Sequence, residues 1–336
     1  MRKREIGRGE RVLPGVWRLR LPLPWPGVPH CNAWALAAGD GIVLVDTGWH
    51  GPGSLAHLER ALHQVHLRLD LVRRLVVTHA HADHVGEAAT IRERSGCAVW
   101  AHPRHEHLTQ ALHDPEEALR RRLEVARTSG VPLAPLQEYA ERRRTQGTGV
   151  AGPVVFDHDL VPGVVVDTDL GPWEVVETPG HAPSHVCLFQ RERRLLISGD
   201  HLLGRVSLYY DFGWSPDPVG EFLGSLDRVE DLGARLCLPG HGRTFADVTG
   251  HIAANRALVA ERIAKVLDVV TYDGPLTAFE AVPRVYEAPI TELNAQWWLT
   301  ETLCYLRRLE AEGRIERVGE DPERWAAVPL RPRAVA

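Results

Sequence analysis

THAHADH, residues 78–84, follows directly after the apolar run LVRRLVV at 71–77. The apolar run is typical of a buried β-strand, so the histidines stand in the loop where that strand ends. Three imidazoles and one carboxylate so close together do not suit a hydrophobic core, because each would need a buried hydrogen-bond partner of its own. We therefore favour a metal site over the alternative, an exposed polar loop.

The spacing inside this loop suits two metal positions. His79 and His81 point to the same side, as residues two apart do in an extended chain, whereas Asp83 and His84 lie past the bend and can face a second point. Imidazole and carboxylate ligands without thiolates suit Zn²⁺, and Fe or Mn are also compatible with them. One loop cannot fill two coordination spheres, so we expect further ligands at other strand ends.

Three later segments offer such ligands, each after an apolar run of the β type. They are Pro179-Gly180-His181, Ser198-Gly199-Asp200 and Pro239-Gly240-His241-Gly242. A glycine beside a candidate ligand permits a tight turn and a close approach of the backbone. Each dipeptide alone is a weak signal, but their recurrence after apolar runs makes His181, Asp200 and His241 candidate ligands.

The first 250 residues alternate between strand and helix patterns, which favours an α/β domain. Strand patterns cover 12–47, 71–77, 97–102, 154–200 and 234–240, and helical spacing covers 52–69, 85–95 and 218–233. Residues 103–148 differ, because they combine two arginine triplets with leucines at helical intervals. This stretch predicts a helical insertion or lid on the main domain, with the arginines on solvated helix faces.

Residues 251–336 predict a second, mainly helical domain. Helical patterns at 251–272 and 291–312 flank a helix that starts with a capping box at Thr277 and Glu280, and a two-stranded hairpin follows. Three helices and a hairpin make a winged-helix outline. The segment has 11 basic and 13 acidic residues, which argues against DNA binding and favours packing against the main domain or a second subunit.

The composition is that of a globular protein without a nucleic-acid or membrane signature. The chain has 336 residues, of which 44% are hydrophobic and 25% charged, and a net charge of −5. No apolar stretch approaches the length of a membrane span, and no secretory signal is evident. Five scattered cysteines, never in a CxxC spacing, are typical of reduced thiols in a cytoplasmic protein.

These motifs resemble the metallo-β-lactamase superfamily over residues 12–250. Five blocks occur in order: Asp46 in VLVDTG, the 78–84 loop, His181, Asp200 and His241. The resemblance implies a four-layer αββα sandwich at 1–250, here with the 103–148 insertion, and two metal ions in a cleft at one edge. The 251–336 module resembles the glyoxalase-II-like branch with a β-lactamase-associated winged helix, which includes hydrolases and an endoribonuclease.

The resemblance also implies a role for each ligand. His79, His81 and His181 would hold the first metal, and a second set, bridged to it by Asp200, would hold the other. This second set consists of Asp83, His84 and His241. Asp46 would orient the ligand loop through a hydrogen bond to an imidazole.

The expected reaction is hydrolysis by a dinuclear zinc site. Two divalent ions roughly 3.5–4 Å apart can share a hydroxide, which attacks a substrate that the same ions polarise. Asp83 can accept a proton from the attacking water, and the expected substrate is an ester, thioester or lactone-type small molecule. The alternatives are a metal-dependent endoribonuclease or phosphodiesterase, a mononuclear iron dioxygenase, and a regulator without catalysis. We expect no membrane partner, and homodimerisation stays open.

Four further residues are candidates outside the ligand set. His185, four residues after His181, is a candidate hydrogen-bond partner for a ligand, with a structural role as the alternative. Tyr209 and Tyr210 are candidate substrate contacts, with core packing as the alternative. Trp25, in the Pro/Gly-rich loop at 24–30, is a candidate apolar contact over the cleft, and an exposed loop is the alternative.

Overall fold

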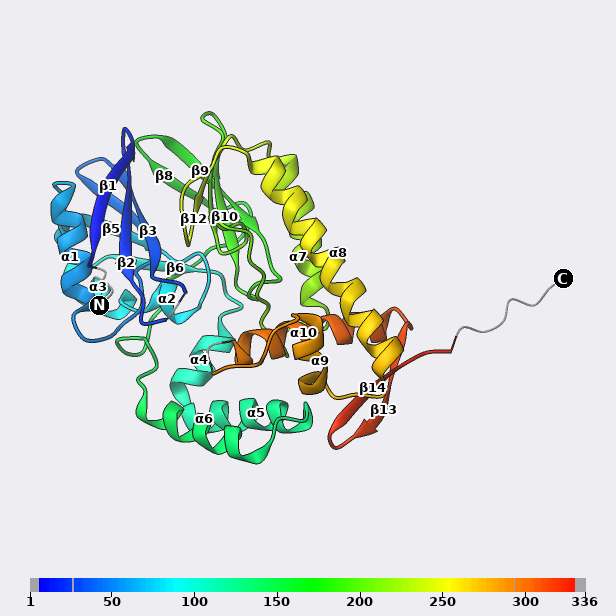
Figure 1. The fold of residues 1–336 in the computed structure, drawn as a ribbon. Helices are drawn as coiled ribbons and strands as arrows, with labels where there is room; N and C mark the ends of the chain where they lie inside the picture. The colour runs from blue at the N-terminus through cyan, green and yellow to red at the C-terminus, as the bar shows by residue number, and fades with distance from the viewer. Residues whose placement is uncertain (1–5, 26, 293, 330–336) are drawn as a thin grey trace. The chain divides into compact units, whose positions relative to one another are not determined.

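The structure is a computed structural model that describes residues 6–25, 27–292 and 294–329. The chain divides into two compact units, which are described separately (Figure 1). The first consists of Met1–Pro115, Gln146–Ser207 and Glu221–Asn255, and the second of Glu116–Thr145, Leu208–Gly220 and Arg256–Ala336.

The first unit contains a seven-stranded sheet in the order β1-β2-β3-β4-β5-β6-β7. Its strands are β1 (Arg8–Leu13), β2 (Val16–Pro22), β3 (His30–Ala38), β4 (Gly41–Val45), β5 (Val72–Val76), β6 (Ala98–Ala101) and β7 (His158–Asp159). The strands from β1 to β4 pair antiparallel, and those from β4 to β7 pair parallel. The apolar run in β4 is buried on both faces, as parallel pairing between two layers requires.

The second sheet of this unit has five strands in the order β12-β11-β10-β9-β8. They are β8 (Val165–Thr168), β9 (Gly171–Glu177), β10 (Val186–Gln190), β11 (Leu195–Gly199) and β12 (Leu236–Pro239). β11 and β12 are parallel, and the other pairs are antiparallel. Trp34 and Val45 of the first sheet pack with Trp173 and Ile197 of the second in a common core.

Helices cover the outer faces of both sheets. Those of the first unit are α1 (Ser54–Gln64), α2 (Ala82–Val85), α3 (Ala88–Ser95) and α4 (Glu106–His113), with η1 (Leu69–Leu71) and most of α7 (Pro218–Asp231). Leu58 and Ile91 of α1 and α3 pack against the face of the first sheet that carries Leu19 and Leu44. α7 lies on the second sheet, where the Ser225 hydroxyl donates to the Pro179 carbonyl at 2.8 Å. The predicted four-layer α/β sandwich is confirmed.

Two local features differ from the sequence-based predictions. The helix expected over 85–95 is split into α2 and α3 around Gly86, where a Cβ would collide with the Gly48 carbonyl. β7 is two residues long and pairs with β6, although His158 and Asp159 lie outside the apolar β runs within the 154–200 stretch. In both places a tertiary contact, and not local propensity, determines the backbone.

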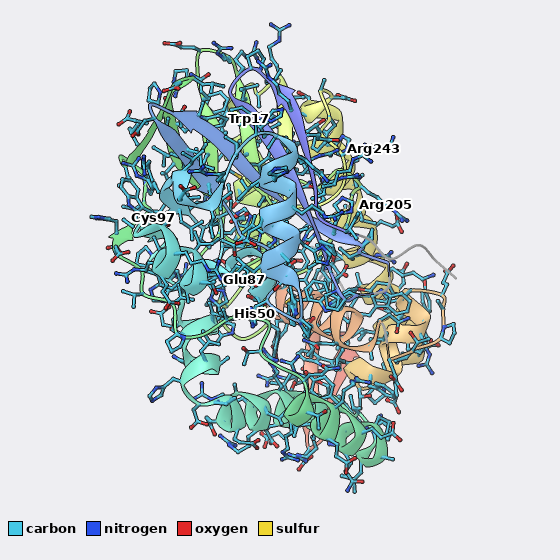
Figure 2. The ribbon with its side chains drawn as sticks, turned by 90° about the vertical axis from the view of Figure 1, so that its left-hand side faces the viewer. Trp17, His50, Glu87, Cys97, Arg205 and Arg243 are labelled. Atoms are coloured by element: carbon cyan, nitrogen blue, oxygen red, sulfur yellow. The ribbon has the colours of Figure 1, made fainter. Side chains whose placement is uncertain are left out.

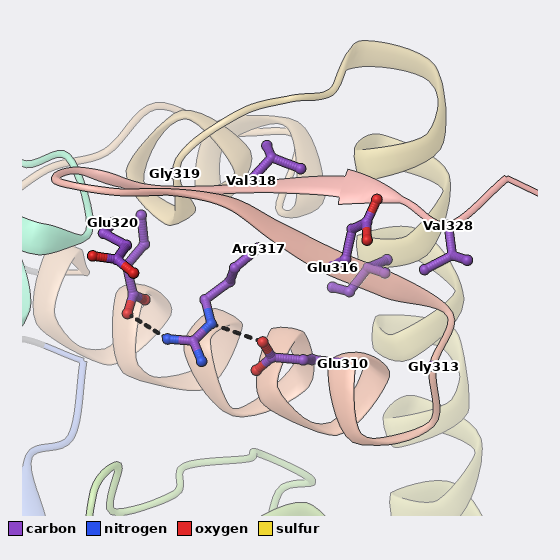
Figure 3. Close-up of a pocket in the computed structure, with 10 residues that line it drawn as sticks. Glu310, Gly313, Glu316, Arg317, Val318, Gly319, Glu320 and Val328 are labelled. Carbon is purple, nitrogen blue, oxygen red and sulfur yellow. Dashed lines mark hydrogen bonds and ion pairs between the residues drawn. The ribbon is translucent and has the colours of Figure 1, made fainter.

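The second unit is mainly helical. It contains α5 (Pro115–Thr128), α6 (Leu133–Thr145), most of α8 (Val248–Asp273), α9 (Ala278–Val285), α10 (Ala295–Ala311) and the hairpin of β13 (Ile315–Glu320) and β14 (Glu323–Ala327). The predicted capping box is present, because Thr277 and Glu280 exchange hydrogen bonds with each other's backbone amides. α10 and β13 line a groove in which Arg317 bonds Glu310 at 2.7 Å and Glu323 at 3.1 Å (Figure 3).

Residues 116–145, expected as part of an insertion in the catalytic domain, belong to this second unit. The Ser129 carbonyl accepts a hydrogen bond from the amide of Phe279 at 3.0 Å. Arg127 pairs with Asp321 at 2.6 Å, so α5 is tied to both the capped helix and the hairpin. These long-range contacts could not be inferred from the helical spacing of the stretch.

A buried carboxylate makes the stability of the second unit depend on pH. Glu301 on α10 is 6% exposed and accepts a hydrogen bond from the Tyr305 hydroxyl at 2.9 Å. Burial raises the pKa of Glu301 from 4.5 to about 7. The stabilising contribution of the raised pKa is fully present below pH 4.5 and is lost as the pH rises through about 7.

We expect Glu301→Gln to remove this loss, because glutamine keeps the acceptor and stays neutral. We compare the free energy of unfolding of the variant with that of the parent at each pH. The difference, variant minus parent, should be about 3 kcal/mol larger at pH 8 than at pH 5. Urea denaturation at both pH values measures it. The exposed Glu320→Gln is the control, and an equal effect of Glu301→Gln at both pH values would contradict the argument.

The described part of the chain also bears on two expectations from composition. All five cysteines are free and buried, in agreement with the expected reduced thiols. Within residues 6–25, 27–292 and 294–329, every helix is too short or too polar to cross a bilayer.

Candidate metal centre

The candidate ligands meet at one edge of the two sheets. β5 leads into the loop with His79 and His81, β11 into Asp200 and β12 into His241. β4 and β5 are parallel, as are β11 and β12, so their carboxyl ends lie at the same edge of each sheet. The amide of Val186, at the start of β10, donates to the Thr78 carbonyl at 2.8 Å and joins the two sheets at this edge.

Three imidazoles form the first cluster. Nδ1 of His81 lies 3.0 Å from Nε2 of His79 and 3.0 Å from Nε2 of His181. One nitrogen from each of the three lies within 4.8 Å of the others. Such a set of converging nitrogens, one of them from a loop a hundred residues away, suits a single divalent ion.

A second cluster combines Asp83, His84 and His241 within the same 4.8 Å limit. Oδ2 of Asp83 lies 3.2 Å from Nε2 of His241 and 3.6 Å from Nε2 of His84. Asp200 stands between the two clusters, because its Oδ2 is 3.1 Å from Nε2 of His241 and 3.8 Å from Nε2 of His181. A carboxylate in this position suits a ligand shared by two ions.

The chemistry of this donor set fits divalent cations. Nε2 of His84 and Oδ1 of Asp200 are buried and, apart from their own 3.3 Å approach, have no hydrogen-bond partner among the described residues. Unpartnered polar atoms are costly inside a protein and point to a missing ligand. Gly240 leaves the space they need, because a Cβ there would collide with Oδ1 of Asp200 and Cε1 of His84.

The carboxylates of the second cluster and Asp200 keep the imidazoles of His84 and His241 protonated at the positions where a cation would bind. Burial lowers the pKa of His241, but the carboxylates of Asp200 and Asp83 outweigh it and raise that pKa to about 10. His84 follows the same pattern, with a pKa well above the usual range. Burial raises the pKa of Asp200, but the neighbouring His241 and His84 charges hold it well below the usual range. A metal ion would displace these imidazole protons, so its affinity should rise with pH.

Asp46 organises the ligand loop from the end of β4. Its carboxylate accepts hydrogen bonds from the Thr78 amide at 2.8 Å, the Thr78 hydroxyl at 2.9 Å and Nδ1 of His84 at 2.8 Å. The last bond fixes the orientation of the imidazole, with Nε2 of His84 turned to the cluster. The backbone of Asp46 has φ 62°, a conformation that aspartate and asparagine tolerate better than other side chains.

We expect Asp46→Asn to fold but to bind metal about 10- to 100-fold more weakly at the His84 cluster. An amide nitrogen in place of the Asp46 oxygen that faces His84 cannot accept a hydrogen bond from Nδ1, so the imidazole loses the bond that orients its ring. Competition with a chelating dye measures the affinity. Asp169→Asn is the matched control, since this exposed carboxylate accepts a bond from the Gly39 amide at 2.8 Å away from the clusters. Unchanged affinity in Asp46→Asn would contradict this role.

The turn that carries His241 is held by β3, which the sequence did not indicate. Nδ1 of His241 donates to the His30 carbonyl at 3.0 Å, which directs Nε2 to the cluster. The buried Asn32 donates from its side chain to the carbonyls of Pro239 at 2.8 Å and Gly242 at 3.0 Å. The one sequence signal that could have identified Asn32 is its polar side chain in an otherwise apolar strand.

A buried glutamate, also missed by the sequence reasoning, secures the loop after β4. Glu87 follows α2 and is 1% exposed. Its carboxylate accepts a bond from Ser54 and lies 2.9 Å from Nδ1 of His50, both in the segment after Asp46 (Figure 2). The Glu87 amide donates to the Thr47 hydroxyl at 3.0 Å. The segments on either side of the cluster are thereby tied together.

His185 hydrogen-bonds the backbone of a candidate ligand, and its ring lies against those of His79 and His181, with centroids 5.0 and 5.9 Å apart. Its Nε2 accepts a hydrogen bond from the amide of Asp200 at 3.0 Å, and its Nδ1 lies 2.7 Å from the Thr178 hydroxyl. Since Nε2 accepts, Nδ1 carries the proton and donates to Thr178. His185 thus positions the turn after β11.

The three predicted substrate contacts do not all belong to the unit that contains the two clusters. Tyr209 and Tyr210 lie in the second unit, where Tyr210 is fully buried and packs against Tyr305 with ring centroids 5.9 Å apart. This burial favours the core-packing alternative for Tyr210. Trp25 lies in the first unit and meets Trp49 edge to face at 5.3 Å. The role of all three as substrate contacts stays a prediction.

Comparison with known proteins agrees with this geometry. The family model of the metallo-beta-lactamase superfamily matches residues 26–241. The chain is 27% identical over 295 residues to the probable metallo-hydrolase YqjP of Bacillus subtilis, covering 83% of this chain and 88% of that protein. It is 21% identical over 285 residues to an atrochrysone carboxyl ACP thioesterase of Aspergillus chevalieri, covering 82% and 75%. A crystal structure of a metallo-beta-lactamase family protein from Thermus thermophilus superposes with a TM-score of 0.81 at 28% identity, covering 95% of this chain and 100% of the other.

Proposed function

Since the chain belongs to the metallo-beta-lactamase superfamily and is a metallo-hydrolase, we propose that it is a dinuclear zinc enzyme that hydrolyses an ester or thioester. The single observation that carries this proposal is Asp200, whose two oxygens approach imidazoles of both clusters at 3.1–3.8 Å. The three-imidazole cluster would hold one ion, and Asp83, His84 and His241 the other. Zinc fits ligands that are all nitrogen or carboxylate oxygen.

The ions would polarise the scissile carbonyl and lower the pKa of a water. The protein supplies the rest of the chemistry. Asp46 and the His30 carbonyl accept hydrogen bonds from Nδ1 of His84 and of His241, which directs both Nε2 atoms to the other candidate ligands. The Asp83 carboxylate, 6% exposed, can take the proton of the attacking water.

In the reaction the water oxygen bonds to the acyl carbon and the bond from that carbon to sulfur or oxygen breaks. The leaving thiolate or alkoxide takes a proton, and no covalent enzyme intermediate is needed. The name of the fungal relative, an acyl-carrier-protein thioesterase, favours the thioester. Within the second unit, α8, α9, α10 and the hairpin of β13 and β14 support the further proposal of a winged-helix module of the glyoxalase-II-like branch.

The test is a substrate panel with the zinc-loaded protein. It contains an aryl ester, an acyl thioester, a lactone, a phosphodiester and a single-stranded RNA, and each turnover is compared with that of Asp83→Asn. We expect hydrolysis of the thioester or ester that Asp83→Asn loses. Cleavage of the RNA or phosphodiester alone would refute the proposal in favour of a nuclease.

A further inference from the structure

Five arginines of the first unit form a basic surface at its β1–β2 edge, here called the arginine face. They are Arg8, Arg18, Arg20, Arg205 and Arg243. In the antiparallel pair of β1 and β2, Arg8 stands directly opposite Arg20, and Glu10 opposite Arg18. Residues in such register share one side of the sheet, and the intervening Leu19 packs on the other side, against the helix-covered core.

The arginine face adjoins the turn that carries His241. The guanidinium of Arg18 donates to the Gly242 carbonyl at 3.1 Å. The Gly204 amide donates to the His241 carbonyl at 3.0 Å, and a Cβ on Gly204 would collide with the Arg243 backbone. This contact brings Arg205 and Arg243 together on the same side of the first unit (Figure 2).

The positive charge of the face is largely uncompensated. Glu10 pairs with Arg18, whereas no carboxylate among the described residues pairs with Arg8, Arg20, Arg205 or Arg243. The groove of the second unit is different, since its Arg317 has two carboxylate partners. Like charges directly across a strand pair are destabilising, which makes the Arg8–Arg20 pair costly without a counter-ion.

Two buried donors on this face have no acceptor. Arg18 is 8% exposed, and the Nε atoms of Arg18 and Arg20 are both buried without a hydrogen-bond partner among the described residues. Burial lowers the pKa of Arg18, and the nearby charges of Arg20 and Arg243 act in the same direction although Glu10 opposes them. An anion with several oxygens bound beside these guanidinium groups would offset the repulsion among their charges.

We propose that the arginine face binds a phosphate group of the substrate, an acyl thioester whose thiol half carries phosphate. Guanidinium groups suit phosphate because their planar donors match its oxygens in pairs. The face lies beside the turn that carries the candidate ligand His241. With its phosphate bound at the face, an extended thioester would therefore place its acyl group at the metal centre. This inference rests on the proposed thioester hydrolysis.

The first experiment compares one acyl group on two thiols, coenzyme A with its phosphates and N-acetylcysteamine without. We expect Arg20→Gln and Arg243→Gln each to raise KM for the coenzyme A ester about tenfold or more, with kcat unchanged, because each removes a charged hydrogen-bond donor. The neutral thioester should be unaffected. The control is Arg193→Gln, at the β10–β11 turn and so at the opposite end of these strands from Asp200. Equal effects on both thioesters, or none on either, would overturn the inference.

A second experiment does not depend on turnover. Pyrophosphate and the free thiol of coenzyme A are titrated calorimetrically into the parent and the two variants. If both compounds bind the parent and bind each variant about tenfold or more weakly, the result supports the arginine face. This holds even if neither thioester is hydrolysed, and in that case only the proposed function fails. Binding of pyrophosphate but not of the coenzyme would assign a free anion to the face and overturn the substrate role. Preferential binding of a single-stranded RNA would overturn it in favour of a nucleic acid.

Discussion

Replacing Asp200 with asparagine is expected to lower kcat/KM by about 10³-fold or more, equivalent to about 4 kcal/mol of transition-state stabilisation. Asp200 is a candidate ligand carboxylate whose oxygens approach imidazoles of both clusters. Asparagine keeps its shape, so the turn beside Gly240 should still pack. The charge that balances His84 and His241 is lost, however, and metal binding should weaken at both clusters.

Steady-state kinetics and metal content measured on the same preparation test this expectation. Asp167→Asn, an exposed carboxylate on β8, is the control and should behave as the parent. If Asp200→Asn kept most of its activity and a full metal complement, Asp200 would not be shared by two ions.

Replacing Asn32 with alanine is expected to lower stability by about 2–5 kcal/mol and kcat by about 100-fold. Two buried carbonyls, of Pro239 and Gly242, would lose their side-chain donor. The turn between them carries His241, so the loss should also weaken metal binding at the second cluster. Metal binding at the three-imidazole cluster should persist.

Asn255→Ala separates stability from function in this experiment. Asn255 is also buried, at 2% exposure, and its side chain donates to the His251 carbonyl at 2.8 Å within α8. Its replacement should cost stability without a change in metal content. Denaturant titration and metal analysis of both variants decide the matter, and equal metal content in the two would show that Asn32 has a purely structural role.

The candidate ligands could be predicted from the sequence because their signals are local. Each stands in a short motif directly after an apolar strand, and parallel strands bring their carboxyl ends to one edge whatever the details of the loops. The α/β class followed from the alternation of strand and helix patterns, whereas the four layers were implied by the resemblance of the motifs to the superfamily. The strand and helix boundaries depend on single contacts, as at Gly86, and were less accurate.

Other parts of the site depend on contacts between distant residues. Asn32 bonds a carbonyl 207 positions away in the sequence, and nothing near it in the chain indicates that partner. The partners of α5 could not be inferred either, because an amphipathic helix shows which of its faces is buried but not what covers it. Pairing register reveals the arginine face, since Arg8 and Arg20 become neighbours only when β1 folds onto β2.

The central claim is that seven side chains from four segments bind two ions, and elemental analysis tests it most directly. The protein is purified without added metal or chelator, and metal is quantified per chain by mass spectrometry. We predict about two zinc ions per chain in the parent and a reduced content in Asp200→Asn. One iron per chain, or no metal after incubation with zinc, would contradict the account.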